Sequence, residues 1–347
     1  MNNHNRVIID KKFIKKSLLK NEDIALSLSR FIDNSIKARE EVTTKKNPCR
    51  IKISIFENLI VVNDNSGGIR NNITDKDLFK IGNNVDDSKS GIGMKKSLCR
   101  LGNKIDIVSN RKDCSRKFSM DLDDEGEELE SIEQVVDYDC NSDEGTTIYI
   151  TNLEEKVSKE IQGIGFEKKI IKSIGRMYSK FINKEKLKLK LNNYIINAVN
   201  VEAEYIDSCV ILDKYIVELY KGNKEAPGMD IFINDYMIYN RVKSKEVCWN
   251  FLNEAKHTYS DCIVEVDYSG SKEIFENEKD ELTKKIIDFI KNNKVHFQSK
   301  TITIQYEMPI EKVEDLKNYY GEDTAKGVGI KAFNKLYQDY IWNRNKK

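Results

Sequence analysis

The feature that most constrains the fold is an acidic turn that directly follows an apolar strand. Residues 59–62 read Leu-Ile-Val-Val and predict the end of a strand. Asp64 comes next, and a run of small residues then closes with Gly67 and Gly68. Glycine tolerates positive φ and lets another backbone or a ligand come close. A carboxylate at the mouth of such a turn needs a hydrogen-bond donor, because leaving it unpaired is costly. An amino group on a flat heterocycle is one candidate donor, and an ordinary surface turn is the alternative.

Length and charge set broad limits on the class of protein. With 347 residues the chain is long enough for two domains, although one large domain is the alternative. Hydrophobic residues make up 39% of it, which is enough for real cores, and charged residues make up 33%. The charges cancel to +1, so the composition gives no overall electrostatic argument for a nucleic-acid or membrane partner.

Cysteine and histidine usage argues against a disulfide framework or a zinc site. The 7 cysteines are scattered without a Cys-x-x-Cys pair, and the chain has 3 histidines. We therefore expect reduced thiols in a cytoplasmic protein and no zinc. The N-terminus lacks the apolar core of a signal peptide, and no apolar run approaches the length of a membrane span, so we expect no membrane partner.

An amphipathic helix is predicted before the acidic turn and its strands. Caps at residues 21–23 precede an apolar stripe at helical spacing, which consists of Ile24, Leu28, Phe31, Ile32 and Ile36. Arg30, Asn34 and Lys37 fall together on another face of this helix, where a solvated surface is the plain interpretation. Other strands are predicted at residues 50–56, 104–109, 117–122 and 145–150, with a solvated acidic loop or hairpin tip at 121–133.

Glycines also mark the beginning of a second helix. A short helical turn is predicted over residues 78–84 and ends around Gly82, and a polar segment follows at residues 85–90. The sequence Gly91-Ile92-Gly93-Met94-Lys95 then opens a helix that ends near Leu101. Free N–H groups at a helix N-terminus favour an anion, and the Lys95 side chain could reach the same anion. A lone Gly-x-Gly is a weak signal, so an ordinary turn is the alternative for this segment taken alone.

The pattern changes after Leu153, and the second half of the chain is predicted to be α+β. A basic helix is predicted over residues 154–183, and we place a domain boundary near 152–158. Further strands are predicted at 187–191, 209–219, 229–239, 262–266 and 300–306, and helices at 278–292, 313–320 and 330–342.

Four segments in this order resemble the motifs of a nucleotide-binding domain shared by DNA gyrase, the large heat-shock chaperone, histidine kinases and MutL, the GHKL family. They are Phe31-Ile32-Asp33-Asn34-Ser35-Ile36-Lys37-Ala38, Asp64-Asn65-Ser66-Gly67-Gly68-Ile69, Gly91-Ile92-Gly93-Met94-Lys95 and Gly145-Thr146-Thr147. MORC-like and MutL-like members look nearest, because their first motif also contains Asp-Asn-Ser. The resemblance implies an α+β protein with a Bergerat-type α/β sandwich that binds ATP at residues 1–153. A transducer-like domain related to a ribosomal protein would follow at 154–310, and a C-terminal helical segment at 311–347.

The resemblance also implies the cofactors, ATP and Mg²⁺, and a role for each motif. Asp64 would accept a hydrogen bond from the adenine amino group, with Thr146 and Thr147 supporting it from the next strand. Asn34 would bind Mg²⁺, which prefers oxygen ligands. The Gly91 and Gly93 backbone would hold the phosphates, and the segment at 85–90 would form a lid. The implied nucleotide-binding residues are Asn34, Lys37, Asp64, Gly68, Ile69, Gly82, Gly91, Ile92, Gly93, Met94, Lys95 and Thr146.

Two positions bear on catalysis. Hydrolysing members of the family carry a glutamate four residues before the Mg²⁺-binding asparagine, whereas this chain has Arg30, which stays protonated and cannot be a general base. Asp33 should point about 100° away around the helix. A transducer lysine reaches the γ-phosphate in relatives, and Lys279 is our candidate because residues 277–280 resemble a loop before a helix. A merely solvated lysine is an equal alternative there.

Two functions therefore remain open at the sequence level. One is an ATP-dependent clamp that forms a homodimer on binding ATP and acts on DNA or a partner protein, in DNA-related or defence processes. The other is a non-hydrolysing ATP-binding switch that regulates a partner protein. A histidine kinase is disfavoured, because His4 lies too near the terminus to sit on a phospho-accepting helix.

Overall fold

The computed structural model divides into two compact units, Met1–Phe297 and Gln298–Lys347. It describes residues 23–42, 48–74, 78, 92–112, 114–123, 131–136, 144–222, 226–252, 258–297, 310–320 and 335. In the second unit the described part is α10 (Ile310–Tyr320), which confirms the helix predicted at 313–320, together with Lys335. The strand predicted at 300–306 and most of the helix predicted at 330–342 lie outside the described residues. Among the described helices, none is long and apolar enough to cross a membrane.

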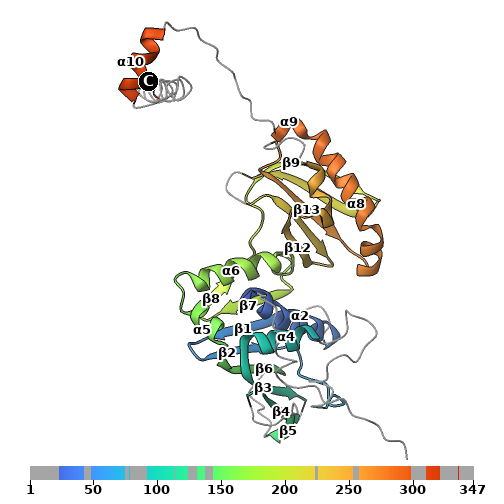
Figure 1. Ribbon diagram of the computed structural model, residues 1–347. Coiled ribbons are helices and arrows are strands. Elements are labelled where there is room, and N and C mark those ends of the chain that lie inside the picture. The colour runs from blue at the N-terminus through green and yellow to red at the C-terminus, as the bar shows by residue number, and fades with distance from the viewer. Residues whose placement is uncertain are drawn as a thin grey trace, which may run out of the picture. The chain divides into compact units, whose positions relative to one another are not determined.

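The first unit begins with an eight-stranded sheet in the order β5-β4-β3-β6-β2-β1-β7-β8 (Figure 1). Its strands are β1 (Cys49–Ile55), β2 (Leu59–Asp64), β3 (Gly102–Arg111), β4 (Cys114–Asp121), β5 (Ser131–Val136), β6 (Gly145–Leu153), β7 (Leu187–Leu191) and β8 (Tyr194–Ile196). All neighbours are antiparallel except β1 and β7, which run parallel. The strands predicted from alternating residues are present, whereas β5 and β8 were missed. The start of β5 falls in the segment predicted as an acidic loop or hairpin tip, and its backbone pairs antiparallel with β4, as a hairpin requires.

Helices cover one face of this sheet, and the core lies between the two layers (Figure 1). They are α2 (Ile24–Val42), α4 (Ile92–Leu101), α5 (Glu155–Ile161), α6 (Phe166–Met177) and α7 (Ser179–Asn183). The apolar stripe predicted on α2 is buried in full. The single helix predicted over 154–183 is wrong, because the chain turns after α5 and Gly165 adopts a φ of +79° just before α6. Positive φ is incompatible with a continuous right-handed helix.

The first sheet extends further along the chain than the predicted boundary near residue 153. After α7 the chain returns to the same sheet, where β7 pairs in parallel with β1 along residues 187–191. The change to a second sheet therefore falls between β8 and the next strand, at residues 197–203. A parallel pairing of this kind needs a long crossover, which α5, α6 and α7 supply.

A second, five-stranded sheet has the order β12-β11-β13-β10-β9. Its strands are β9 (Glu204–Ile211), β10 (Tyr215–Lys221), β11 (Gly228–Ile233), β12 (Tyr236–Val242) and β13 (Cys262–Tyr268), followed by α8 (Lys272–Asn292) and α9 (Lys294–Phe297). Two short 3₁₀ helices, Lys245–Val247 and Trp249–Leu252, precede β13. The segments predicted as strands at 209–219 and 229–239 each contain a hairpin turn, where pairs of residues with positive φ reverse the chain. The sequence predicts the turn at Asn234-Asp235, whereas the turn in the first segment was missed. The turns contain Leu212-Asp213 and Asn234-Asp235.

Buried ion pairs tie α6 and α7 to the second sheet. Arg176 bonds to Asp230, whose side chain is fully buried, and lies 3.4 Å from Glu265. Lys180 pairs with Glu265 and, at 2.7 Å, with Asp267. Because each buried charge is paired with an opposite one, no water is needed to neutralise a charge between these helices and the second sheet.

Candidate nucleotide-binding site

Asp64 ends β2 with its carboxylate almost fully enclosed, at 7% exposure. Its Oδ1 accepts hydrogen bonds from the Ser66 backbone N–H at 2.8 Å, the Ser66 hydroxyl at 2.5 Å and the Thr146 backbone N–H at 3.0 Å. Its Oδ2 accepts from the Ser35 hydroxyl at 2.6 Å. Oδ1 thus accepts three of these hydrogen bonds and Oδ2 accepts one, so Oδ2 is the oxygen with room for a further donor among the described residues.

Two glycines are required by the close approach of backbones around this carboxylate. A Cβ on Gly145, the first residue of β6, would lie 1.9 Å from the Asp64 carbonyl oxygen. Gly68 has a φ of +71°, and its Cβ would lie 2.6 Å from the Asn110 carbonyl oxygen on β3. The glycines singled out in the sequence therefore let three strands converge at one point, as the predicted close approach requires.

Arginine side chains hold the backbone of the turn after β2. The carbonyl oxygen of Asn65 accepts from Arg39, and those of Gly67 and Gly68 accept from Arg111 at 3.1 Å each. Arg116 donates to the carbonyl oxygens of the next residues, which are Ile69, Arg70 and Ile73. Ile69 itself is half-buried against the core and donates its N–H to the Ser109 hydroxyl at 2.7 Å. The turn is thus fixed by bonds to its own backbone, which leaves the Asp64 carboxylate at a defined position.

Sequence reasoning found Asp64 and Thr146 but missed several of their supports. Thr147 was expected to support Asp64, but its hydroxyl instead accepts from the Asn63 side-chain amide at 2.8 Å. Ser35 and Ser66 were missed as donors to the carboxylate, although both lie inside the quoted motifs. A serine two residues after an aspartate is a common turn pattern and could have indicated Ser66. Arg111 and Arg116 carry no comparable sequence signal.

Arg30, Asn34 and Lys37 lie on α2, the helix that donates Ser35. Asn34 and Lys37 are exposed and Arg30 is half-buried. An exposed amide oxygen at Asn34 is compatible with Mg²⁺, which keeps several of its waters when bound. In the described part of the chain, this face of α2 carries exposed polar side chains.

Asp33 faces the opposite way and is engaged with Tyr178, the residue between α6 and α7. The Tyr178 hydroxyl lies 2.6 Å from Asp33 Oδ1 and 2.7 Å from the Ser29 carbonyl oxygen. Burial raises the pKa of Asp33 above its ordinary value of 3.8, against the opposing effects of Tyr178, Lys37 and Arg30. Burial also raises the pKa of Tyr178 well above its usual range. Asp33 is thus oriented towards the helical crossover, not towards the face that carries Asn34.

The motif predicted to hold phosphates is described in part. Gly82, Gly91 and the predicted lid at 85–90 lie outside the described residues. The backbone of Ile92, Gly93, Met94 and Lys95 forms the first turn of α4, which packs against α2 and confirms the predicted helix. The first N–H groups of a helix have no partner inside it and favour an anion.

Lys279 does not lie on a loop as the sequence suggested. Ser271 caps α8 by accepting a hydrogen bond from the Ile274 N–H at 3.2 Å, so residues 277–280 lie within the helix. The ammonium group of Lys279 donates to the Tyr239 hydroxyl at 2.6 Å and lies 5.0 Å from the centre of that ring. The helix begins before the position chosen from the sequence, because the Ser271 cap was overlooked.

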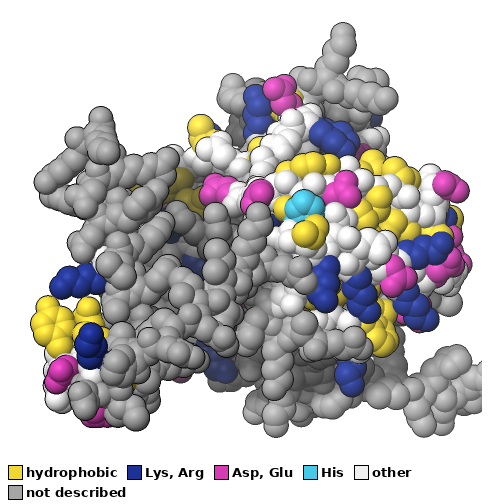
Figure 2. All heavy atoms as spheres, turned by 90° about the horizontal axis from the view of Figure 1, so that it is seen from above, with side chains coloured by type: hydrophobic (Ala, Val, Ile, Leu, Met, Phe, Trp, Pro, Cys, Tyr) yellow, Lys and Arg dark blue, Asp and Glu magenta, His cyan; other side chains and the backbone are white. Residues whose placement is uncertain are grey.

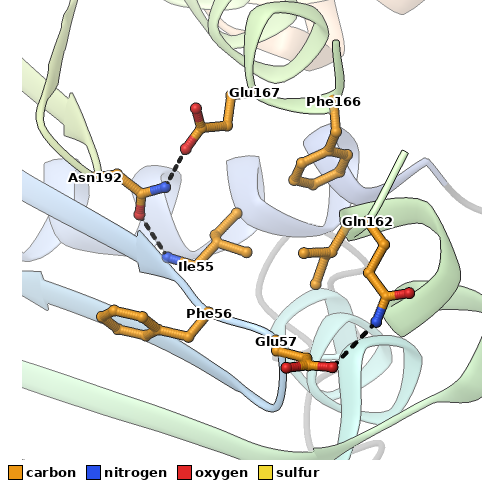
Figure 3. A pocket seen from close by; sticks show the side chains of 8 residues that line it. Ile55, Phe56, Glu57, Gln162, Phe166, Glu167 and Asn192 are labelled. Atoms are coloured by element: carbon orange, nitrogen blue, oxygen red, sulfur yellow. Dashed lines mark hydrogen bonds between the residues drawn. The ribbon is translucent and has the colours of Figure 1, made fainter. Parts of the chain in front are cut away.

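An open cavity of about 510 Å³ lies at the other end of the β1–β2 hairpin (Figure 3). It is lined by Ile55, Phe56, Glu57, Ile161, Gln162, Phe166, Glu167 and Asn192. Asn192 bridges two of its walls by accepting from the Ile55 N–H and donating to Glu167. None of the predicted nucleotide-binding residues lines this cavity, so it is separate from the site at Asp64.

The eight-stranded sheet and the helices on one of its faces fit an α/β sandwich of the GHKL ATPase type. Residues 24–154 match the family model described as histidine kinase-, DNA gyrase B-, and HSP90-like ATPase. The matched segment runs from the first residue of α2 to the residue after β6, and so contains all four motifs. This part of the chain is therefore similar to GHKL-type ATPase domains. A search of curated proteins found no significant match to the chain.

Proposed function

We propose that this protein binds ATP with Mg²⁺ and acts as an ATP-dependent conformational switch or dimerising clamp. The observation that carries the proposal is the buried Asp64 carboxylate, which is satisfied on Oδ1 and has one acceptor position left on Oδ2. An exocyclic amino group of adenine fills such a position. A base that cannot donate there would leave a buried charge underbonded, which gives specificity for adenine.

The remaining motif residues fit the other parts of the nucleotide. Asn34 would contribute an oxygen ligand to Mg²⁺, whose charge would neutralise phosphate oxygens. The first turn of α4 would present backbone N–H groups to the phosphates, and Lys95 would add positive charge beside them. Lys37, on the same face of α2 as Asn34, would lie close to the same anionic groups.

A physical connection supports a switch. Helix α2 meets the adenine anchor through Ser35 and meets the helical crossover through Asp33 and the Ser29 carbonyl oxygen. The crossover in turn bonds to the second sheet through Arg176 and Lys180. A nucleotide that shifts α2 would therefore act on groups that contact the second sheet, which would play the part of a transducer.

A second candidate function is an ATP-binding regulator that does not hydrolyse ATP. Arg30 occupies the position of the expected general base and cannot accept a proton. Asp33 is the adjacent carboxylate, but it is held against Tyr178. For either function we infer a homodimer in the ATP-bound state, acting on DNA or on a partner protein. A role in DNA-related or defence processes follows by analogy with MORC-like and MutL-like proteins.

Light scattering and phosphate release together test these functions. We expect a shift from monomer to dimer with ATP–Mg²⁺ or a non-hydrolysable ATP analogue, and no shift for Asp64→Asn. Asp106→Asn makes the same chemical change at a half-buried pair with Lys117, outside the four motifs, and serves as the control. A clamp that works by hydrolysis predicts phosphate release above that of Asp64→Asn, whereas a non-hydrolysing switch predicts none. If the nucleotide changes neither mass nor shape, the switch is refuted.

A further inference from the structure

The cavity beside the β1–β2 hairpin has the size of a site for a small molecule. Its volume of about 510 Å³ lies within the range of about 300–1,000 Å³ that is usual for such sites. Four separate parts of the fold meet around it, which are the hairpin at 55–57, the end of α5 at 161–162, the start of α6 at 166–167 and the turn after β7 at 192.

Two carboxylates lie at opposite ends of this cavity. Glu167 lies beside Asn192 at one end, and Glu57 lies beside Gln162 at the other (Figure 3). Asn192 donates its side-chain amide to Glu167 Oε1, and Gln162 donates to Glu57 Oε1 at 3.4 Å. Among the described residues, the Oε2 atom of each carboxylate accepts no hydrogen bond. Both ends of the cavity can therefore accept a further donor.

No positive charge in the described part of the chain compensates these carboxylates. The lining holds two acidic residues and no basic one, and Lys169, on the same helix as Glu167, pairs with Glu160 and Asp23. The chain as a whole has a formal charge of +1, and on the face drawn in Figure 2 acidic and basic side chains are interspersed. The cavity is thus a local negative region, which favours a cation.

The middle of the cavity is apolar. Ile55 and Phe166 lie between the two carboxylates (Figure 3), and Ile161 also lines the cavity. A metal ion would gain nothing from these walls, and among the described residues no group of three acidic, histidine or cysteine side chains could hold one. An alkyl chain would be removed from water against the same walls, which is favourable. The lining therefore fits a cation that carries an apolar stem.

We propose that this cavity binds a linear aliphatic diamine. One ammonium group lies at Glu57 and the other at Glu167, and the alkyl chain between them crosses Ile55 and Phe166. Alkylammonium groups stay protonated at neutral pH, as lysine does, and each has three hydrogens to donate. The inference goes beyond the proposed function and does not depend on it, because none of the proposed nucleotide-binding residues lines the cavity.

The ends of the cavity are held at a fixed separation. Asn192 accepts a hydrogen bond from the Ile55 N–H at 2.8 Å while it donates to Glu167, and Ile55 ends the strand that leads into the turn with Glu57. A diamine that is too short can reach only one carboxylate, so a fixed separation selects one chain length. A monoamine has no such optimum, because each added methylene only increases the apolar surface that it buries.

Calorimetric titration of the full chain with linear diamines, from 1,4-diaminobutane to 1,8-diaminooctane, tests the proposal. We expect saturable binding of one diamine per chain, with the highest affinity at one chain length. The best diamine should bind about fivefold more tightly than the monoamine of equal length, as one further exposed ion pair allows. Glu57→Gln and Glu167→Gln should each abolish this preference, because the second ammonium group then has no carboxylate to meet.

Glu155→Gln is the matched control and should keep the preference for the diamine. Glu155 and Glu167 each lie in the first turn of a helix, so both replacements remove the same favourable interaction with the helix dipole. Glu155 pairs with Lys159 and does not line the cavity. Glu57 is exposed in a turn, so Glu57→Gln should keep the wild-type melting temperature, and its loss of the preference would not reflect unfolding.

Three results would overturn the proposal. They are affinity that rises steadily with diamine length, a preference for the diamine that persists in Glu57→Gln or Glu167→Gln, and the absence of saturable binding. Tighter binding of Nα-acetyl-lysine methylamide than of any diamine would also overturn it, because the cavity would then take a lysine side chain of another protein. Glu57→Gln should bind ATP as the wild type does, so failure of this proposal and failure of ATP binding are distinguishable.

Discussion

The hydroxyl of Ser35 lies 2.6 Å from Asp64 Oδ2, so a helix and a strand 29 residues apart in sequence meet at one buried carboxylate. Ser35 points inward from α2, while Asn34 beside it is exposed. Helix α2 can therefore hold the proposed adenine anchor through Ser35 and offer Asn34, the residue before it, as a Mg²⁺ ligand. The distance between the base-binding and phosphate-binding parts of the site is then set by a rigid helix.

Replacement of Ser35 should weaken both the fold and nucleotide binding. Ser35→Ala removes a donor from a buried charge, and we expect a loss of about 1.5–3 kcal/mol in the free energy of unfolding, with weaker ATP binding. Urea denaturation and calorimetric titration with ATP–Mg²⁺ measure the two effects. Ser29→Ala is the matched control, because within the described residues the Ser29 hydroxyl bonds only to the Leu26 carbonyl oxygen of its own helix. Equal effects of the two replacements would contradict a special role for Ser35.

A methyl group at Gly145 should separate two strands at the site. Its Cβ would lie 1.9 Å from the Asp64 carbonyl oxygen, so β6 and β2 must move apart and the bond from Thr146 to Asp64 is lost. We expect Gly145→Ala to destabilise the protein by about 1–3 kcal/mol and to weaken ATP binding. Gly163→Ala, whose Cβ would be no closer than 3.1 Å to another residue, should have little effect. Wild-type melting and binding by Gly145→Ala would show that the strands are not held this closely.

These features indicate what sequence could and could not predict. The α2 stripe, the strand before Asp64 and the glycine turns were predictable, because periodicity and backbone freedom are local properties. Ser35 as a partner of Asp64 was not predictable, since the pairing depends on how α2 packs on the sheet. Likewise β7 reads as an ordinary alternating strand, and nothing local shows that it pairs with β1. For that reason the sequence did not indicate that the first sheet continues beyond residue 153.

Arg30 offers a direct test of the missing general base. If the absent glutamate alone prevents hydrolysis, Arg30→Glu should raise ATP turnover, because a carboxylate at this position can accept a proton from the attacking water. Phosphate release measures the effect. Arg30→Gln is the control, since it removes the positive charge without adding a base. Equal turnover in the two variants would mean that losing the arginine, not gaining a base, is responsible.

Asp33 should make stability depend on pH. The Tyr178 hydroxyl has one hydrogen for two acceptors, Asp33 and the Ser29 carbonyl oxygen, so a protonated Asp33 completes the network. The pKa of Asp33 is raised by burial, so the folded state binds its proton more tightly than the unfolded state. The contribution of Asp33 to stability should therefore fall as the pH rises above its ordinary value of 3.8.

Thermal melting of Asp33→Asn and of the wild type, from about pH 4 to about pH 7, checks this pH dependence. The range begins near the ordinary pKa of a carboxyl group. The variant should lose the fall in stability attributed to Asp33, because an amide can donate to Tyr178 at every pH. Asp213→Asn, in the turn between β9 and β10, is a suitable control and should follow the wild type. A wild-type pH profile for Asp33→Asn would exclude Asp33 as the titrating group.

Lys279 shows a different limit of sequence reasoning. A charged segment at a predicted helix start looks like a loop when the true cap lies earlier, and here Ser271 moves the start of α8 before the lysine. In the described structure, the ammonium group of Lys279 donates to the Tyr239 hydroxyl and lies over the Tyr239 ring. Contacts of this kind depend on the second sheet, which no local pattern encodes.

Calorimetric titration of ATP–Mg²⁺ into wild type and Asp64→Asn tests the central claim most directly. In the variant, an amide donor would face Ser35 and the adenine amino group at the position of a carboxylate oxygen, so the anchor would repel the base. The account predicts that the wild type binds one ATP per chain with saturation and binds little GTP. It also predicts that Asp64→Asn loses ATP binding while its melting temperature equals that of the control Asp106→Asn. Wild-type affinity in a folded Asp64→Asn would contradict it.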